Sequence, residues 1–355
     1  MLVFAVLLFV PIFVQHVATK RNNDSYYEKK NQMALMLFFF FLVTLLAFRD
    51  KTVGNDTMNY IRYFNKYLNL EWSELRRYDI EFGYAMFNKM ISLFSREPQF
   101  FLCISSIVIC TLIFPTYRRL CVDSSLTVTL FCILPTFVMM FSGIKQMIAI
   151  GIGFVAYEFT RNKRLIPFAL AVIIASTFHA SAIVLAIMYP IYNVRITKKW
   201  LYVVVPSILA IFIFNRPIFS FLSSILEQYT EYDTTITETG AYTMLILFVL
   251  FAVFSFIVPN EEVMDDETIG LRNFLLLSVI LQIFAPLHTL SMRINYYFIM
   301  FIPLLLPKII AYSKVKWQQI AIVARYVMIV FFSIYFFISI TSDSNLSVYP
   351  YRFLR

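Results

Sequence analysis

The sequence has little charge and little glycine. Only 14% of the 355 residues are charged, 7 are glycine, and no acidic, Gln/Asn-rich or Ser-rich tract is present. Without such tracts there is no sign of a separate soluble domain or a disordered tail. Cysteine is also scarce and forms no CxxC pair, which argues against a disulfide framework or a zinc site and fits small core residues. The four cysteines are Cys103, Cys110, Cys121 and Cys132.

Hydrophobic residues make up 60% of the chain, and the mean hydropathy is +0.74. Soluble domains have roughly half apolar residues, so we predict a single integral membrane domain over residues 1–355. The net charge of +9 does not indicate a nucleic-acid partner, because lysine and arginine lie in short clusters between apolar runs. Such clusters are typical of membrane topology and of contact with membrane lipids. The run 2–14 lacks a basic n-region and is interpreted as a span, not a cleaved signal peptide.

The order of apolar runs predicts an all-α, polytopic helical membrane protein with about 10–12 transmembrane helices, some of them broken or re-entrant. A span needs about 20 apolar residues, and fewer where helices are broken inside a bundle. The candidate spans are 2–17, 33–48, 99–116, 126–141, 147–160, 165–178, 180–192, 200–215, 242–258, 273–289, 294–307 and 317–340.

Basic clusters predict the orientation, because lysine and arginine in short loops stay on the cytoplasmic side. With these spans, five clusters fall on one side; they are 20–30, 118–119, 161–164, 195–199 and 308–316. The acidic loop 260–268 falls on the same side, against the trend. Loops 49–98 and 216–241 fall outside, and so do the breaks at Gly143 and His179 and the turn before Arg293.

The first outer loop contains the polar stretch "RDKTVGNDTMNYIRYF", residues 49–64. Gly54 provides a sharp turn, and Asp56 or Thr57 would be the N-cap of an amphipathic helix that lies in the membrane interface. The simpler role for Asp56 is to cap this helix, without any part in binding or catalysis. For Arg49, at the end of a span, the simpler role is to reach the lipid headgroups.

Two further polar groups follow. Glu81 lies near the outer end of the short segment 78–95, which we interpret as half-inserted or re-entrant. The alternative is that Glu81 is only a surface residue of a loop rich in charge. Ser142 and Gly143 begin a helix whose first turn holds Lys145 and Gln146. A helix N-terminus with an ammonium group favours an anion, although a lysine there can also reach for headgroups.

His179 and Ser181 interrupt the apolar stretch 173–190, and a break at His179 keeps the basic cluster 195–199 inside. A histidine there is either a hydrogen-bonded core residue or a proton acceptor. Arg293 lies at the start of the candidate span 294–307, where it either reaches for headgroups or binds phosphate with its forked donors.

The order of five motifs, R…G-x-D-T…Y, E-x-G-Y, S-G-x-[basic]-Q, F-H-x-S and R-x-x-Y-Y, resembles the EpsG family of bacterial polysaccharide polymerases, a branch of the Wzy-type O-antigen polymerases. The resemblance runs from residue 49 to about 300, and Lys145 departs from it, because the family usually has arginine before the glutamine. The motif residues are Arg49, Gly54, Asp56, Thr57, Tyr60, Glu81, Gly83, Tyr84, Ser142, Gly143, Lys145, Gln146, Phe178, His179, Ser181, Arg293, Tyr296 and Tyr297.

The resemblance implies a multi-pass enzyme of the bacterial cytoplasmic (inner) membrane whose active site faces outside. It would transfer a growing glycan from undecaprenyl diphosphate to a hydroxyl of the next lipid-linked repeat unit, without metal or cofactor, and a chain-length regulator protein would be a partner. The candidate bases are His179, Asp56 and Glu81, with His179 ranked first because carboxylates beside cations are weaker bases. The diphosphate would be bound by Arg49, Lys145, Arg293, Ser142 and Gly143. The other substrate-binding candidates are Tyr60, Tyr84, Gln146, Ser181, Tyr296 and Tyr297.

Two alternatives stay open. In the first, the chain is a lipid-sugar-dependent glycosyltransferase in which Asp56 and Glu81 hold a divalent metal. In the second, it is a flippase or transporter of lipid-linked oligosaccharide, whose charged groups would be expected near the membrane midplane.

Overall fold

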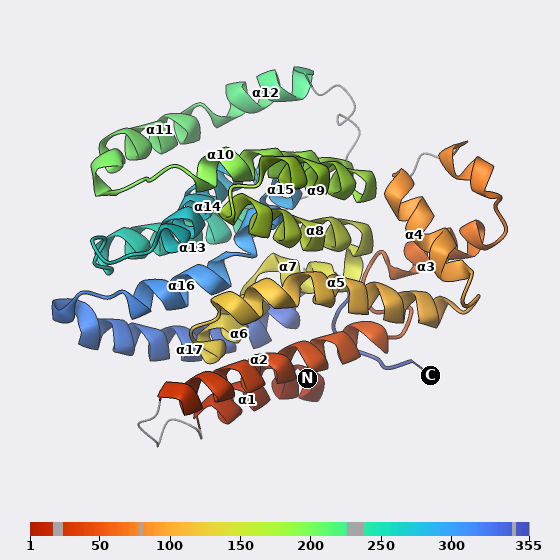
Figure 1. The fold of residues 1–355 in the computed structure, drawn as a ribbon, viewed down its shortest axis with the longest axis horizontal. Helices are drawn as coiled ribbons and strands as arrows, with labels where there is room; N and C mark the ends of the chain where they lie inside the picture. Colours follow the sequence, from red (N-terminus) through yellow and green to blue (C-terminus); the bar gives the residue numbers. More distant parts are fainter. Residues whose placement is uncertain (17–23, 78–80, 226–237, 343–345, 355) are drawn as a thin grey trace. The chain divides into compact units, whose positions relative to one another are not determined.

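A computed structural model describes residues 1–16, 24–77, 81–225, 238–342 and 346–354. In these ranges the chain forms helices, and its β contacts are two isolated bridges, Arg49 with Phe353 and Pro259 with Ser313. The chain divides into two compact units, residues 1–186 with 323–355 and residues 187–322. Figure 1 labels the helices of both. The helical, polytopic architecture predicted from the apolar runs is confirmed, and the two units are described separately.

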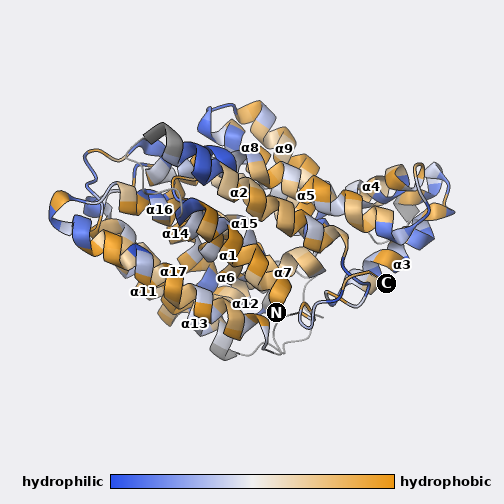
Figure 2. Ribbon diagram, turned by 90° about the horizontal axis from the view of Figure 1, so that it is seen from below, coloured by the Kyte–Doolittle hydropathy of each residue, from blue (hydrophilic) through white to orange (hydrophobic). Residues whose placement is uncertain are grey.

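The first unit contains the helices that carry the first outer loop and the breaks at Gly143 and His179. Figure 2 shows α2 and α5 coloured mostly as hydrophobic, whereas the segment around α3 is more hydrophilic. Its helices are α1 (Leu2–His16), α2 (Asp24–Ala47), α3 (Thr57–Leu68), α4 (Phe82–Ser92), α5 (Pro98–Leu120), α6 (Ser124–Ile133), α7 (Pro135–Ser142), α8 (Ile144–Arg161), α9 (Leu165–Phe178) and most of α17 (Gln318–Ile340), with the 3₁₀ turns Trp72–Arg77 and Ala180–Ile187.

One predicted span of this unit is bent. The run 126–141 was expected to be one span, but it forms α6 and α7, which meet at an angle of 66°. Pro135 is the first residue of α7, and Leu134 before it is extended, with φ −73° and ψ 144°. A proline disfavours the helical conformation of the residue before it and has no N–H to continue the helix. The proline therefore explains the break.

Buried amides join the start of α6 to α1 and α2. Gln15 and Asn31 bond each other at 3.2 Å; Gln15 also accepts from the N–H of Ser125 at 2.8 Å, and Asn31 from that of Ser124. The first N–H groups of a helix have no partner within the helix, and leaving them unpaired in a membrane is costly. Asp123 caps the same helix by accepting from Leu126 N at 3.1 Å, and it pairs with Arg325 of α17.

The second unit also has broken helices. Residues Lys198–Ile213 and Asn215–Phe221 meet at 76°, and Leu290–Ile299 and Ile302–Ala311 at 42°. With each bent pair counted as one span, the described part of the whole chain has up to 7 spans by length and composition. The elements are α10 (Met188–Tyr192), α11 (Leu201–Ile213), α12 (Asn215–Ile225), α13 (Glu238–Ile257), α14 (Asp266–Ile283), α15 (Thr289–Ile299) and α16 (Ile302–Ala311), with the 3₁₀ turns Lys198–Trp200 and Val315–Trp317.

The acidic loop 260–268, which opposed the charge trend, is paired with neighbouring cations. Arg272 bonds Glu261 at 2.7 Å, and Arg195 bonds Asp266 at 2.6 Å. Lys308 lies 3.7 Å from Asp265 and 3.5 Å from Glu267. The loop therefore lies beside residues of the basic clusters 195–199 and 308–316, and its negative charge is compensated locally. This explains how an acidic loop can share a side with basic clusters.

The first outer loop is packed against the junction of α7 and α8. Gly54 has φ +89°, and a Cβ there would overlap the carbonyl oxygen of Phe141. Thr57 Oγ1 donates to Val53 O at 2.7 Å and lies 3.2 Å from Phe141 O. The predicted turn at Gly54 is confirmed, and it needs glycine both for the positive φ and for the close approach.

The chain's C-terminal segment holds the other side of this loop. Backbone N–H groups of Gly54, Asn55 and Asp50 donate to carbonyls of this segment at 3.1, 2.9 and 2.9 Å. Leu354 N donates back to Phe48 O at 2.9 Å, and Tyr351 Oη donates to Leu45 O at 2.8 Å. The loop is therefore bonded on both sides, by the α7–α8 junction and by residues 346–354.

Replacing Gly54 with alanine tests this packing. The variant Gly54→Ala should lower the free energy of unfolding by about 1–3 kcal/mol, because the alanine has a disfavoured φ and a Cβ that meets backbone. Thermal melting of the full chain in detergent measures the effect. The matched control is Gly153→Ala in α8, where the new Cβ meets only the end of the Leu185 side chain at 3.1 Å. Equal melting temperatures for the two variants would contradict the role given to Gly54.

Candidate functional site

Three side chains that are far apart in the sequence meet in the first unit. The carboxylate of Glu81 accepts from Lys145 Nζ at 2.8 Å (Oε2) and 3.0 Å (Oε1). His179 Nδ1 lies 3.1 Å from Glu81 Oε1. Glu81 is the residue before α4, Lys145 is in the first turn of α8, and His179 ends α9. We call these three residues the Glu81 cluster.

Local sequence places each member of the Glu81 cluster. Gly83 lies so close to α9 that a Cβ there would overlap Thr177, so α4 can approach the end of α9 and bring Glu81 to His179. His179 is extended, with φ −154° and ψ 120°, and its N–H closes α9 by donating to Ala175 O at 3.1 Å. Gly143 separates α7 from α8 and puts Lys145 in the first turn. The breaks predicted at Gly143 and His179 are confirmed.

The environment keeps Glu81 ionised. Burial raises its pKa, but hydrogen bonds from His179 and Lys145, together with the charge of Lys145, outweigh burial and lower the pKa to about 2. A carboxylate only accepts hydrogen bonds, so the hydrogen between Glu81 and the imidazole belongs to Nδ1 of His179. The side chains of Lys145, Glu81 and His179 are 30%, 19% and 16% exposed, so a ligand can reach them.

The Glu81 cluster and a basic cluster lie at opposite ends of α8. At the far end, Glu158 pairs with Arg119 at 2.9 Å and with Arg161 at 3.3 Å. A helix of 18 residues is about 27 Å long, close to the roughly 30 Å of a bilayer core. Figure 1 shows α8 and α9 side by side, with α4 beside one end of them. This arrangement fits the predicted topology, in which basic clusters lie inside and the polar breaks outside.

Arg49 is enclosed, which differs from the exposed position expected for a group that binds phosphate or reaches headgroups. Arg49 is only 1% exposed, and its Nη1 donates to Leu46 O. Burial lowers the pKa of Arg49 to about 10, although the charges of Tyr351 and Tyr60 act to raise it. The C-terminal segment covers it, since Phe353 pairs with Arg49 in a β-bridge. Sequence analysis missed this segment, because nothing in its pattern points to a loop 300 residues earlier.

Asp56 differs from the expected cap. It precedes α3, but its φ of −93° and ψ of −2° are helical and its side chain makes no capping hydrogen bond. Its backbone N–H instead donates to Ser142 Oγ at 3.3 Å. A capping carboxylate normally comes from an extended residue, so the helical backbone explains the missing bond. Asp56 thus connects the first outer loop to the α7–α8 junction through its backbone.

Most of the remaining candidates are buried. Tyr60 and Tyr84 are 7% and 0% exposed, and their rings pack edge to face with centroids 5.7 Å apart. They form the core beneath α3 and α4, so their ring faces are not available for stacking on a sugar. Ser142, Gly143 and Gln146 are also buried, and Ser181 is half-buried.

In the second unit, His288 caps α15 by accepting from Leu290 N at 3.0 Å. Arg293, one turn later, is half-buried, and Tyr296 and Tyr297 are 5% and 1% exposed. The two tyrosines therefore support the helix that carries Arg293 and do not present open ring faces.

The ionised state of Glu81 predicts a pH dependence of stability. Because the folded-state pKa is about 2 and the ordinary value is 4.5, the contribution of Glu81 is complete above pH 4.5 and is lost as the pH falls toward 2. The loss is at most about 1.4 kcal/mol per pH unit. The stability advantage of the wild type over Glu81→Gln, measured by melting in detergent at pH 5, 4 and 3, should shrink over this range. An advantage that is constant from pH 5 to 3 would contradict the lowered pKa.

Comparison with known proteins places the chain in a family. Neither a search of curated proteins nor a search of solved structures gives a match. The model of the EpsG family matches residues 32–353, which is most of the chain. The match includes the Glu81 cluster, Arg49, Arg293 and all but the last residue of the segment 346–354. The chain therefore belongs to the EpsG family and has a role of the polysaccharide-polymerase type.

Proposed function

We propose that the protein polymerises a surface polysaccharide (O-antigen, capsule or exopolysaccharide) at the outer leaflet of the bacterial cytoplasmic membrane. In this reaction a growing glycan leaves undecaprenyl diphosphate and is joined to a hydroxyl of the next lipid-linked repeat unit. The observation that carries the proposal is the hydrogen bond between Glu81 and His179 in a partly exposed cluster at one end of α8 and α9. A histidine oriented by a carboxylate can serve as a base for the acceptor hydroxyl.

His179 is the proposed base. Glu81 holds the hydrogen on Nδ1, so the lone pair of Nε2 is the proton acceptor. As the acceptor hydroxyl attacks the anomeric carbon, its proton passes to Nε2, and the bond from that carbon to the diphosphate oxygen breaks. Glu81 orients the imidazole and stabilises the imidazolium that forms, and its pKa of about 2 makes it a poor base itself.

Cations are proposed to stabilise the diphosphate as it leaves. Lys145 has three N–H donors, of which the two oxygens of Glu81 occupy two, so one donor remains for a single contact. Arg293 has a forked guanidinium suited to phosphate, but it belongs to the second unit, and its part in binding the diphosphate stays a prediction from the sequence. Arg49 is enclosed and is better suited to hold the first outer loop in place than to touch the diphosphate. Gln146 and Ser181 flank Lys145 and His179 in sequence and remain candidate substrate contacts.

Two observations favour this proposal over the alternatives. A metal held by Asp56 and Glu81 would have to displace or tolerate the ammonium of Lys145, which lies 2.8 Å from the carboxylate. A flippase would be expected to carry its charged groups near the membrane midplane. The Glu81 cluster instead lies at the ends of α8 and α9.

The variant His179→Ala tests the base. Purified protein in detergent is incubated with undecaprenyl-diphosphate-linked repeat units, and glycan length is followed on gels. The rate of elongation should fall about 10²- to 10⁴-fold, because a positioned base contributes about that much. His16→Ala, at the exposed end of α1, is the matched control and should keep wild-type elongation. Normal elongation by His179→Ala would remove this residue from the mechanism. No elongation by the wild type with intact substrate would count against the polymerase.

Chelation tests the metal-using alternative in the same assay. The wild type should elongate glycans at an unchanged rate in excess EDTA, because the proposed chemistry uses only side chains. Loss of activity in EDTA that returns when Mg²⁺ or Mn²⁺ is added would favour the metal-using glycosyltransferase.

A further inference from the structure

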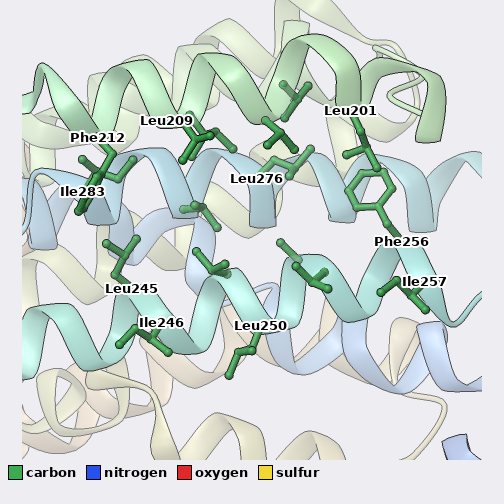
Figure 3. Close-up of a pocket in the computed structure, with 17 residues that line it drawn as sticks. Leu201, Leu209, Phe212, Leu245, Ile246, Leu250, Phe256, Ile257, Leu276 and Ile283 are labelled. Atoms are coloured by element: carbon green, nitrogen blue, oxygen red, sulfur yellow. The ribbon is translucent and has the colours of Figure 1, made fainter.

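An apolar groove runs along the second unit between α11, α13 and α14 (Figure 3). Its volume is about 580 Å³, and every side chain that lines it is apolar. Leu209 of α11 and Val249 of α13 are 55% and 39% exposed, so the groove is open along its side. Such a surface in a membrane helix faces hydrocarbon and fits a lipid chain.

The length of the groove corresponds to one leaflet. Along α11 its lining extends from Leu201 to Phe212, about 17 Å at 1.5 Å per residue. Half of a bilayer core is about 15 Å. Figure 3 shows Leu201 and Phe256 at one end and Phe212 and Ile283 at the other. One acyl chain therefore fits between a headgroup at one end and the bilayer centre at the other.

Two lysines lie at the Leu201 end. The 3₁₀ turn Lys198–Trp200 leads directly into α11, and Lys198 N donates to Glu261 Oε2 at 3.2 Å. Lys314 N donates to Val258 O at 3.2 Å, one residue after α13 ends. Both backbone contacts are with residues 258–261, the segment directly after α13. Two lysines therefore lie beside the same short segment at this end of the groove.

The carboxylates near these lysines are paired with other cations. Glu261 is bonded to Arg272, whose guanidinium also lies 3.9 Å from the ring centre of Phe256. Asp266 of the same loop pairs with Arg195, and Asp265 and Glu267 lie near Lys308. Within the described residues, neither Lys198 nor Lys314 forms a salt bridge. Two like charges side by side repel, and an anion between them relieves the repulsion.

We propose that this groove binds one acyl chain of an anionic phospholipid whose phosphate is held by Lys198 and Lys314. The apolar lining accounts for the chain, the length accounts for a single leaflet, and the lysine pair accounts for the negative headgroup. The basic clusters beside the lysines place this end on the cytoplasmic side of the predicted topology. The lining of the groove contains no polar side chain that could take part in glycosyl transfer, so we assign it a lipid and not the transfer reaction.

Photochemical labelling tests this site. The full chain is placed in nanodiscs with phosphatidylglycerol or phosphatidylcholine that carries a diazirine in the acyl chain, and labelled residues are mapped by mass spectrometry. At equal mole fraction, labelling of 201–212 and 245–257 should be at least about five-fold greater with phosphatidylglycerol, as expected for a lysine near a membrane surface. Leu209→Trp, which fills the groove, should reduce this labelling.

The double variant Lys198→Gln/Lys314→Gln should bring the ratio of labelling by phosphatidylglycerol to labelling by phosphatidylcholine close to one. The matched control Lys29→Gln/Lys30→Gln, a lysine pair in α2, should leave the ratio unchanged. Equal labelling by both lipids, or a preference that survives the Lys198/Lys314 change, would overturn the proposal. So would displacement of the labelled phospholipid by an equal mole fraction of undecaprenyl phosphate, which would make the lipid carrier the occupant. If residues 201–212 and 245–257 carry no lipid label while other residues of the protein do, a bound helix and not a lipid occupies the groove, and the proposal is overturned.

Discussion

The carboxylate of Glu81 is the interaction on which the proposed site depends. It joins a short segment outside the membrane-length helices to the start of α8 and the end of α9. Without it, the ammonium of Lys145 and the imidazole of His179 would lose their common partner, and the start of α4 would lose a polar attachment to the helices behind it. One side chain therefore sets the position of the loop segment, the tautomer of the histidine and the net charge of the cluster.

That charge changes the chemistry the site can support. A free lysine at a helix start favours an anion strongly, but Lys145 shares its charge with Glu81, and the neutral cluster attracts a diphosphate less. In the proposed reaction, transfer of the acceptor's proton to His179 would restore a net positive charge as the diphosphate gains negative charge. The cluster would then favour the leaving group in the transition state more than the substrate in the ground state, which is how a binding interaction contributes to rate.

Other contacts of the first unit attach the first outer loop to the helix junction from which Lys145 starts. Gly54 and Asp56 pack the first outer loop onto the α7–α8 junction, and residues 346–354 cover its other side. Arg49 is buried beside that segment, where its guanidinium donates to the Leu46 carbonyl. Polar groups in the interior, such as Gln15 and Asn31, bond the free N–H groups at the start of α6, as the absence of water in a membrane requires.

The sequence by itself determined the helical membrane architecture, since long apolar runs leave no other way to satisfy the backbone in lipid. It also determined the breaks at Gly143 and His179, because local residue types set local backbone geometry. Only the tertiary structure decided that Glu81 contacts residues 64 and 98 positions away. It also decided that Arg49 is buried, that the tyrosines are core residues and that Asp56 is no side-chain cap. Periodicity shows which face of a helix is apolar, but not which distant segment covers that face, because that depends on packing between helices.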